Sequence, residues 1–176
     1  AFGDAGAVVV KDEQLANDFK VFRNYGSEKR YHNKVVGANS RLDELQAGLL
    51  RVRLQHKQEL TEEKVKIAKR YTAEINNDKI RLPKLADGAT GVWHQYVIRC
   101  EERDRLIEYL NEKEIGTIIH YPIPPHLAEA YQYLGHKPGF LPITEHLAET
   151  VLSIPMYNGM TEEEQSYVIE ALNAFH

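Results

Sequence analysis

The amino-acid sequence predicts an α/β fold, with a strand and helix of one lobe, a long connecting helix, and a compact α+β lobe. Three observations predict it. A short apolar run at residues 7–10 leads into a helical pattern, helical periodicity recurs over 42–75, and strand-like and helix-like segments alternate after Pro83. The predicted division is 1–41, 42–78 and 79–176.

Composition narrows the class of protein. The chain has 176 residues, 43% hydrophobic and 27% charged, which is typical of one ordinary globular domain or slightly more. A net charge of −4 argues against a nucleic-acid partner, and no apolar run is long enough to span a bilayer. The single Cys100 excludes an internal disulfide framework and suits a reducing compartment. We therefore expect a cytoplasmic protein without a nucleic-acid or membrane partner.

The first lobe opens with residues 7–10, which predict a buried strand because they are apolar and β-branched. Asp12 is placed to cap a helix whose apolar positions Leu15, Phe19 and Phe22 recur at four and three residues. That helix should end at residues 24–26. Residues 27–38 show no periodicity and predict an irregular loop.

The connecting helix should begin at Asn39 or Ser40. Two apolar sets support it: Leu42, Leu45, Leu49 and Val52, then Ala68, Tyr71 and Ile75. Residues 55–64 between them are almost entirely polar, so we expect a bend or a solvent-bridging stretch there.

The second lobe alternates strands and helices. Strands are predicted at 80–82, 93–99 and 117–121, with a helix between the last two that buries Leu106, Ile107 and Leu110. Short helices are expected over 126–134 and 144–154. A capping box from Thr161 to Glu164 opens the final helix.

The loop 25–41 is the first candidate for chemistry. Positive charge surrounds Tyr25, Tyr31 and His32, from Arg23, Lys29, Arg30, Lys34 and Arg41. With Asn39 at an expected helix start, the loop suits an anion such as a phosphate or diphosphate. The alternative is a solvated basic loop in which Asn39 is a simple N-cap.

The second candidate is the segment "HYPIPPH". Its prolines favour extended backbone, so they would present His120, Tyr121 and His126 rigidly, as a pocket for a polar substrate requires. The alternative is that His120 is an ordinary strand histidine. A metal site is not expected, because two histidines six residues apart across prolines match no familiar zinc spacing.

Four segments, taken in order, closely resemble the DegT/DnrJ-type sugar aminotransferases: "AFGDAGAVVVKDEQLANDFKVFRNYGS", "GANSRLDELQAGLL", "WHQYVIR" and "IIHYPIPPHLAEAYQYLG". The resemblance implies the aspartate-aminotransferase fold of type I and the cofactor pyridoxal 5′-phosphate (PLP). In that family the Schiff-base lysine lies a few residues before the segment that matches the start of this chain. We therefore expect it upstream of Ala1, and no catalytic residue is predicted here. The chain would be the C-terminal part of the enzyme, and alone it should neither transaminate nor bind PLP.

The resemblance also implies roles for individual residues. Asn39 matches the asparagine that reaches the PLP phosphate of the other subunit in a homodimer. Tyr31 and His32 match a loop bordering the sugar-nucleotide site, and His120, Tyr121 and His126 match the wall on the sugar side. Glutamate and a nucleotide-linked keto-deoxysugar would be the substrates. The "HYPIPPH" form is most similar to members that act on dTDP-linked 3-keto-6-deoxyhexoses for surface-polysaccharide synthesis.

Two other functions fit parts of the sequence. A free-standing sugar-nucleotide binding or regulatory module could use 25–41 and 120–126 without catalysis. A structural protein built around the helix 42–75 is less favoured, because the apolar pattern lasts barely two heptads.

Overall fold

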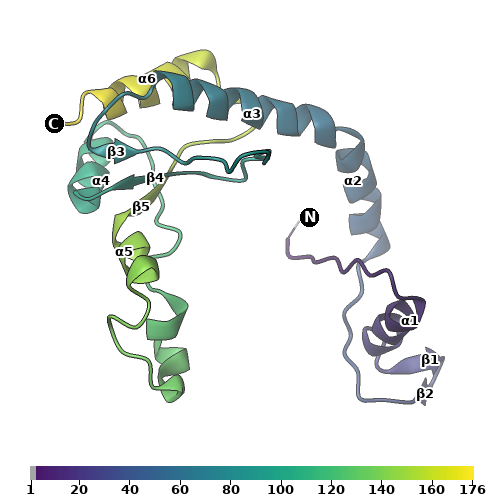
Figure 1. Cartoon of the computed structure of the whole chain (residues 1–176). Helices are drawn as coiled ribbons and strands as arrows, with labels where there is room; N and C mark the ends of the chain where they lie inside the picture. Colours follow the sequence, from purple (N-terminus) through teal and green to yellow (C-terminus); the bar gives the residue numbers. More distant parts are fainter. Residues whose placement is uncertain (1–2) are drawn as a thin grey trace. The chain divides into compact units, whose positions relative to one another are not determined.

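The computed structural model describes residues 3–176, and the chain divides into two compact units. The first unit extends to Lys57 and the second runs from Gln58 to His176 (Figure 1). The three-part division expected from the sequence stays a prediction. Over the described residues, no helix combines the length and apolar character needed to cross a membrane.

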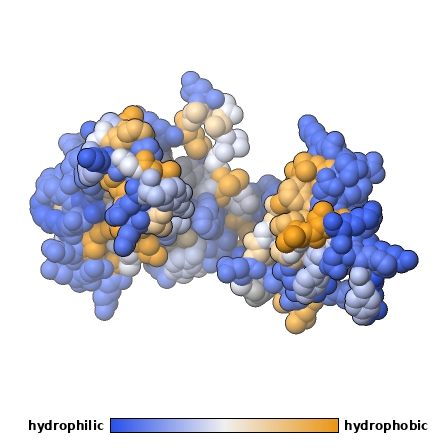
Figure 2. Space-filling view, turned by 90° about the horizontal axis from the view of Figure 1, so that it is seen from below, coloured by the Kyte–Doolittle hydropathy of each residue, from blue (hydrophilic) through white to orange (hydrophobic). Residues whose placement is uncertain are grey.

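The first unit contains the predicted helix α1, Glu13–Phe22. Asp12 is its N-cap, and the Asp12 carboxylate accepts a hydrogen bond from the Leu15 backbone N–H at 2.6 Å, as its position predicts. The periodic side chains Leu15, Phe19 and Phe22 are all exposed rather than packed in a core. Apolar surface is correspondingly open on this unit, seen in orange on the right of Figure 2.

The predicted buried strand at residues 7–10 is wrong in this structure. These residues form no strand, and the side chains of Val8 and Val9 are 66% and 94% exposed. A strand exists only where its backbone pairs with a neighbour, and no described segment pairs with this one. An apolar, β-branched composition cannot supply that partner.

The expected irregular loop contains a small hairpin of β1 (Ser27–Lys29) and β2 (His32–Asn33). Behind it, the chain folds back closely, because the Ala38 N–H donates to the Phe22 carbonyl at 2.8 Å. Gly37 makes this approach possible: a Cβ there would lie 2.1 Å from the Gly26 nitrogen.

Helix α2 is Glu44–Gln55, so the predicted start at Asn39 or Ser40 is wrong by about a turn. Asn39 instead forms an antiparallel bridge with Asn24, and the Ser40 N–H donates to the Arg23 carbonyl at 2.9 Å. This backbone pairing holds the segment extended, and Asp43 becomes the N-cap.

Helix α3 is Lys57–Glu74, and His56 interrupts the helical run between α2 and α3. The interruption falls within the polar stretch 55–64, where the sequence predicts a bend. Helix α3 buries Ile67, Ala68 and Tyr71 in the second unit.

The second unit contains a three-stranded antiparallel sheet in the order β3-β4-β5. Its strands are β3 (Ile80–Arg81), β4 (Tyr96–Cys100) and β5 (Val151–Ile154). The predicted strand 117–121 is wrong, since it contributes only an isolated bridge from Ile118 to Ser153. Residues 151–154 take the third place in the sheet, although the sequence pattern assigned them to a helix. Helix α5 ends before them, at Pro142–Thr150.

Helices cover this sheet. Figure 1 shows α3 beside α6 (Glu162–Asn173), and the Arg70 side chain joins them by donating to the Glu162 carbonyl at 2.9 Å. The predicted capping box of Thr161 and Glu164 is confirmed. Helix α4, Arg103–Glu112, buries Leu106 and Leu110 as predicted, whereas Ile107 is only partly buried. Two short 3₁₀ helices, η1 (Pro125–Leu127) and η2 (Glu129–Leu134), lie where a short helix is expected.

Candidate functional site

The predicted site residues fall into two groups, one in each unit. Tyr31, His32 and Asn39 lie in the first unit, whereas His120, Tyr121 and His126 lie in the second. The structure therefore describes two separate sets of donors and acceptors.

The tip of the β1–β2 hairpin presents Tyr31 and His32 of the first set. Tyr31 has a positive φ of 68° and its side chain is 83% exposed. The Arg30 guanidinium carbon lies 5.0 Å from the centre of the Tyr31 ring, a cation–π contact. His32 follows in β2, opposite Lys29. The hairpin thus exposes a phenol, an imidazole and a guanidinium together.

Asn39 is exposed, and its backbone is held by the bridge to Asn24. The Asn24 side-chain oxygen accepts a hydrogen bond from Arg41 Nη1 at 3.1 Å, and the Arg41 guanidinium carbon lies 5.3 Å from the Tyr25 ring centre. The short segment that carries Asn39 and Arg41 is therefore fixed in place at both residues.

The prediction that helix N–H groups at Asn39 form an anion site is wrong. Helix α2 begins at Glu44, five residues after Asn39, and both its N-cap Asp43 and its first residue Glu44 carry carboxylates. These negative charges oppose an anion at the helix N-terminus. One of the basic residues, Lys34, is also paired with Glu28. The remaining donors are side-chain amide, guanidinium and ammonium groups, not helix N–H groups.

These donors fit one end of PLP. Carboxamide and guanidinium N–H groups bind phosphate oxygens well, so exposed Asn39 and Arg41 suit the phosphate of the cofactor. Neither side chain offers an amine that could hold the aldehyde. The fit of this unit is therefore confined to the phosphate.

His120 is held by the sheet of the second unit. Its Nδ1 lies 2.9 Å from the Ser153 hydroxyl oxygen in β5. Two backbone hydrogen bonds between Ile118 and Ser153, of 2.8 and 3.2 Å, join the segment before His120 to the same residue. Tyr121 is 74% exposed, and its ring meets the His120 ring edge-on at 5.5 Å. His120 and Tyr121 thus form a polar surface that β5 holds in place through Ser153.

His126 is buried, with 9% of its surface exposed, and its Nε2 lies 3.0 Å from Glu145 Oε1. The Glu145 carboxylate also accepts hydrogen bonds from the backbone N–H groups of Gly139 at 2.6 Å and Leu141 at 3.0 Å. The Gly139 hydrogen bond, and after it the one from His126, lower the pKa of Glu145 below its ordinary value. The ionised carboxylate of Glu145 therefore joins His126 to the backbone at Gly139 and Leu141.

Sequence reasoning missed Glu145 and Ser153. Glu145 lies in the first turn of a helix, where the helix dipole already accounts for a carboxylate. Ser153 lies within the apolar run "VLSIP". Its hydroxyl, alone among apolar side chains, is the only feature there that could have indicated a polar contact. Both partners are distant in sequence from the histidines that they contact.

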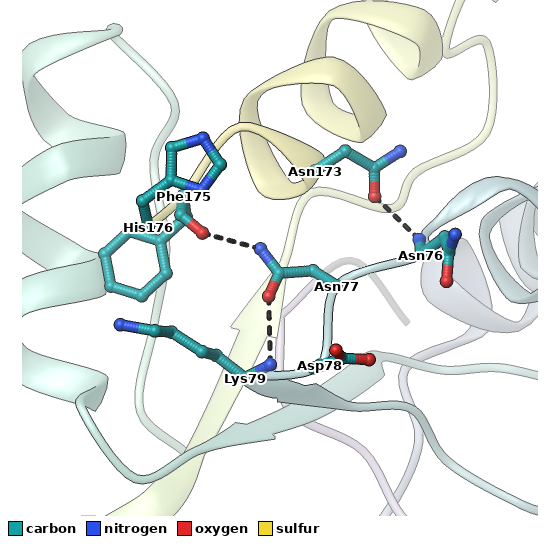
Figure 3. A pocket seen from close by; sticks show the side chains of 7 residues that line it. All are labelled: Asn76, Asn77, Asp78, Lys79, Asn173, Phe175 and His176. Atoms are coloured by element: carbon teal, nitrogen blue, oxygen red, sulfur yellow. Dashed lines mark hydrogen bonds between the residues drawn. The ribbon is translucent and has the colours of Figure 1, made fainter.

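Two further features lie outside these groups. A pocket of ≈ 300 Å³ at the ends of α3 and α6 is lined mainly by polar side chains, several of which are already engaged (Figure 3). There the Asn77 side-chain N–H donates to the Phe175 carbonyl at 2.8 Å. Burial raises the pKa of the Cys100 thiol, which makes it a poor nucleophile. Residues 3–176 contain no group of three metal-ligating side chains.

Comparison with known proteins points to one family. A sequence model described as the DegT/DnrJ/EryC1/StrS aminotransferase family matches residues 1–173. A curated relative from Geobacillus stearothermophilus, named pleiotropic regulatory protein, is 41% identical over 100% of this chain and 48% of its own length. The dTDP-3-amino-3,6-dideoxy-alpha-D-galactopyranose transaminase of Aneurinibacillus thermoaerophilus is 42% identical over 97% of this chain and 46% of its own.

Solved structures agree. The crystal structure of DesV from S. venezuelae matches with a TM-score of 0.91 and 37% identity, covering 94% of this chain and 45% of that one. The likeness confirms the predicted α/β fold of the type I aminotransferases. The chain spans about half the length of the curated relatives it matches.

Proposed function

This chain belongs to the DegT/DnrJ/EryC1/StrS aminotransferase family, and we propose that it forms the C-terminal part of a PLP-dependent sugar aminotransferase. The enzyme transfers the amino group of glutamate to a nucleotide-linked keto-deoxysugar, releasing 2-oxoglutarate and an amino sugar. The observation that carries the proposal is the family match over residues 1–173, together with the sugar-transaminase name of a relative 42% identical.

In this proposal the first unit serves a neighbouring active site. The Asn39 carboxamide donates to the phosphate of PLP bound by the other subunit of a homodimer, and Tyr31 and His32 border the sugar nucleotide. The exposure of all three side chains supports such an intermolecular role. The basic hairpin adds positive potential that attracts a diphosphate.

The second unit supplies the wall on the sugar side. His120 and Tyr121 contact the sugar, because both present polar groups from a backbone anchored to β5. His126 belongs to the same wall at its buried end, where Glu145 orients its ring. Together these residues bind and orient the keto-sugar so that its carbonyl carbon reaches the reacting amine.

PLP, when bound, supplies the aldehyde that accepts the amino group and the electron sink for the reaction. The lysine that holds it is proposed to lie upstream of Ala1. This chain contributes binding and orientation, which matter because a misplaced carbonyl lowers the rate even when the cofactor is intact.

The direct experiment incubates the full-length protein with PLP, glutamate and a dTDP-linked 3-keto-6-deoxyhexose, and follows the amino sugar by mass spectrometry. We expect glutamate-dependent formation of the amino sugar by the full-length protein and none by residues 1–176 alone. Product formation by the isolated chain, or none by the full-length protein with any keto-sugar nucleotide, would contradict the proposal.

Replacing His126 separates the two half-reactions. His126→Ala should raise KM for the sugar nucleotide while the reaction with glutamate proceeds at its normal rate, because the wall lies on the sugar side. Stopped-flow absorbance of the cofactor measures the glutamate half-reaction by itself. Equal damage to both half-reactions would refute a role on the sugar side.

Sugar-nucleotide binding without catalysis is the second candidate, and the name of the G. stearothermophilus relative, pleiotropic regulatory protein, favours it. In that case residues 1–176 should bind a dTDP-sugar as a monomer in isothermal titration calorimetry. The aminotransferase proposal expects little binding by the isolated chain, because its site needs residues from elsewhere.

A further inference from the structure

We propose that Ser153 is a positioning residue that sets the tautomer and orientation of the His120 imidazole. Its hydroxyl oxygen lies 2.9 Å from His120 Nδ1, and its own surface is 6% exposed. The identity of the ligand that His120 then contacts rests on the proposed sugar aminotransferase function. The positioning itself rests on the geometry of the second unit alone.

The buried hydroxyl of Ser153 needs a hydrogen-bond acceptor, because an unsatisfied O–H in a buried site is destabilising. In the part of the chain that the structure describes, His120 Nδ1 is the acceptor that it has. If the imidazole instead donated its Nδ1–H to the hydroxyl oxygen, the Ser153 proton would have no partner. The neutral His120 ring is therefore the tautomer with its proton on Nε2.

Ser153 is well placed to hold the ring because its own backbone cannot shift easily. It pairs with Val97 in the sheet, and its neighbours Leu152 and Ile154 are buried in the core. It also exchanges two backbone hydrogen bonds with Ile118, two residues before the histidine. The hydroxyl and the imidazole are thus attached to the same rigid frame.

The consequence concerns what His120 can recognise. With Nδ1 engaged by Ser153, the nitrogen left for a ligand is Nε2, and it carries an N–H donor. A donor suits a carbonyl, hydroxyl or phosphate oxygen of a keto-sugar nucleotide and disfavours a ligand N–H. Ser153, which touches no ligand in this proposal, would decide this preference through the ring.

The first test reads the tautomer directly. Residues 1–176 are labelled with ¹⁵N-histidine, and two-bond ¹H–¹⁵N spectra are recorded near pH 8.5, about two units above the ordinary histidine pKa. The His120 signals are assigned by their absence in His120→Gln. We expect the Nε2–H form in the wild type and a substantial population of the Nδ1–H form in Ser153→Ala.

Thr150→Val is the matched control, because it removes another buried hydroxyl near β5 whose hydrogen bond goes to the His146 carbonyl. It should leave the His120 tautomer unchanged. An Nδ1–H form in the wild type, or the same tautomer in the wild type and Ser153→Ala, would overturn the proposal.

The second test is a double-mutant cycle in the full-length enzyme. Ser153→Ala should raise KM for the keto-sugar nucleotide roughly 3- to 10-fold, the value of one hydrogen bond. In the His120→Gln background, whose amide places an N–H near the Nε2 position without help from Ser153, the same change should have no further effect. Equal effects of Ser153→Ala in both backgrounds would indicate a structural role and overturn the proposal.

The two tests also separate this proposal from the proposed function. If the spectra show the expected tautomers but His120→Ala, which removes the N–H donor, leaves KM for every keto-sugar nucleotide unchanged, the sugar contact of His120 fails and the role of Ser153 in positioning its ring stands. If the wild-type ring carries its proton on Nδ1 while the enzyme aminates the sugar, the positioning role of Ser153 fails and the proposed function stands.

Discussion

The two units of this chain are stabilised in different ways. The second unit contains every buried apolar side chain among the described residues, from Ile67 in α3 to Phe175 after α6. In the first unit, from residue 3 to Lys57, Gly26 is the sole buried residue. The helix α1 nevertheless has the same apolar periodicity as helices of the second unit, and its Phe19 and Phe22 are 41% and 51% exposed.

This difference shows that amphipathic patterning and burial are separate properties. Each Å² of apolar surface removed from water contributes about 25 cal/mol, but only where an opposing surface exists. The second unit provides that surface from its own sheet and helices. The first unit is held by local backbone hydrogen bonds, such as Tyr25 N–H to the Ala38 carbonyl at 2.9 Å, and leaves its apolar residues open.

The strongest test of this comparison is a pair of leucine truncations. Leu152→Ala, in the centre of β5 with 0% exposed surface, should reduce the free energy of unfolding by about 2–5 kcal/mol. Leu45→Ala, 79% exposed in α2, should change it by less than about 0.5 kcal/mol. Urea unfolding of residues 1–176 measures both. Similar losses for the two variants would mean that the first unit packs against another surface in solution.

A glycine substitution in the first unit tests whether the two units are stabilised independently. Gly37→Ala should destabilise the first unit by roughly 2–3 kcal/mol, because its Cβ would meet the Phe22 carbonyl oxygen at 2.5 Å. Hydrogen exchange should speed up over residues 22–38 and stay unchanged in β4 and β5. Gly48→Ala in α2 is the control, since a Cβ there meets nothing within 4 Å. Faster exchange in the sheet would show that the units are not independent.

Removing the proposed phosphate contact of Asn39, in the first unit, should have a smaller effect. In the full-length protein, Asn39→Ala should weaken PLP retention about tenfold, the value of one hydrogen bond to a charged group. Absorbance of PLP after dialysis measures the loss. Asn17→Ala, an exposed asparagine of α1, is the matched control and should retain the cofactor. Unchanged retention in Asn39→Ala would count against the phosphate contact.

The smallest effect is a pH dependence in the second unit. The pKa of Glu145 is lowered in the folded state, mainly by the Gly139 N–H and then by His126. Its hydrogen bonds therefore stabilise the fold fully above the unfolded pKa, near 4.3, and this stability is lost as pH falls through the lower folded pKa. The Tm difference between wild type and Glu145→Gln should be larger at pH 7 than at pH 3.

Glu149→Gln is the control for this dependence. It removes a carboxylate from the same helix, at a residue that makes no comparable set of hydrogen bonds among those described. Its Tm difference from the wild type should vary less between pH 3 and pH 7. A Glu145→Gln difference that stayed constant with pH would show that the carboxylate is not held in its charged form.

Sequence reasoning was reliable where one local signal was sufficient. The Asp12 cap and the Thr161–Glu164 capping box each join residues three positions apart, and both are confirmed. Of the predicted buried stripe of the fourth helix, Leu106 and Leu110 are buried and Ile107 is partly buried. The interruption at His56 also follows a local cue, the polar stretch around it. The family, and with it the fold class, followed from four segments in order and is confirmed by the match over residues 1–173.

Reasoning from the sequence failed where pairing between distant segments decides the structure. Residues 117–121 and 151–154 both contain apolar, β-branched residues, but 151–154 pair with β4 as a strand, whereas 117–121 contribute only the bridge from Ile118 to Ser153. Asn39 satisfies the local signature of an N-cap, yet its pairing with Asn24, fifteen positions earlier, holds it extended. A local pattern cannot show which of two possible pairings forms.

By itself, the sequence determined the capped helix starts at Asp12 and Thr161, the class of fold and the family, because these depend on short-range hydrogen bonds and on the order of recognisable segments. Only the tertiary structure decided which strand completes the sheet, that Ser153 meets His120, and that Glu145 meets His126. Those contacts join residues 33 and 19 positions apart. Their formation depends on the packing of the whole second unit, which no local stretch of sequence specifies.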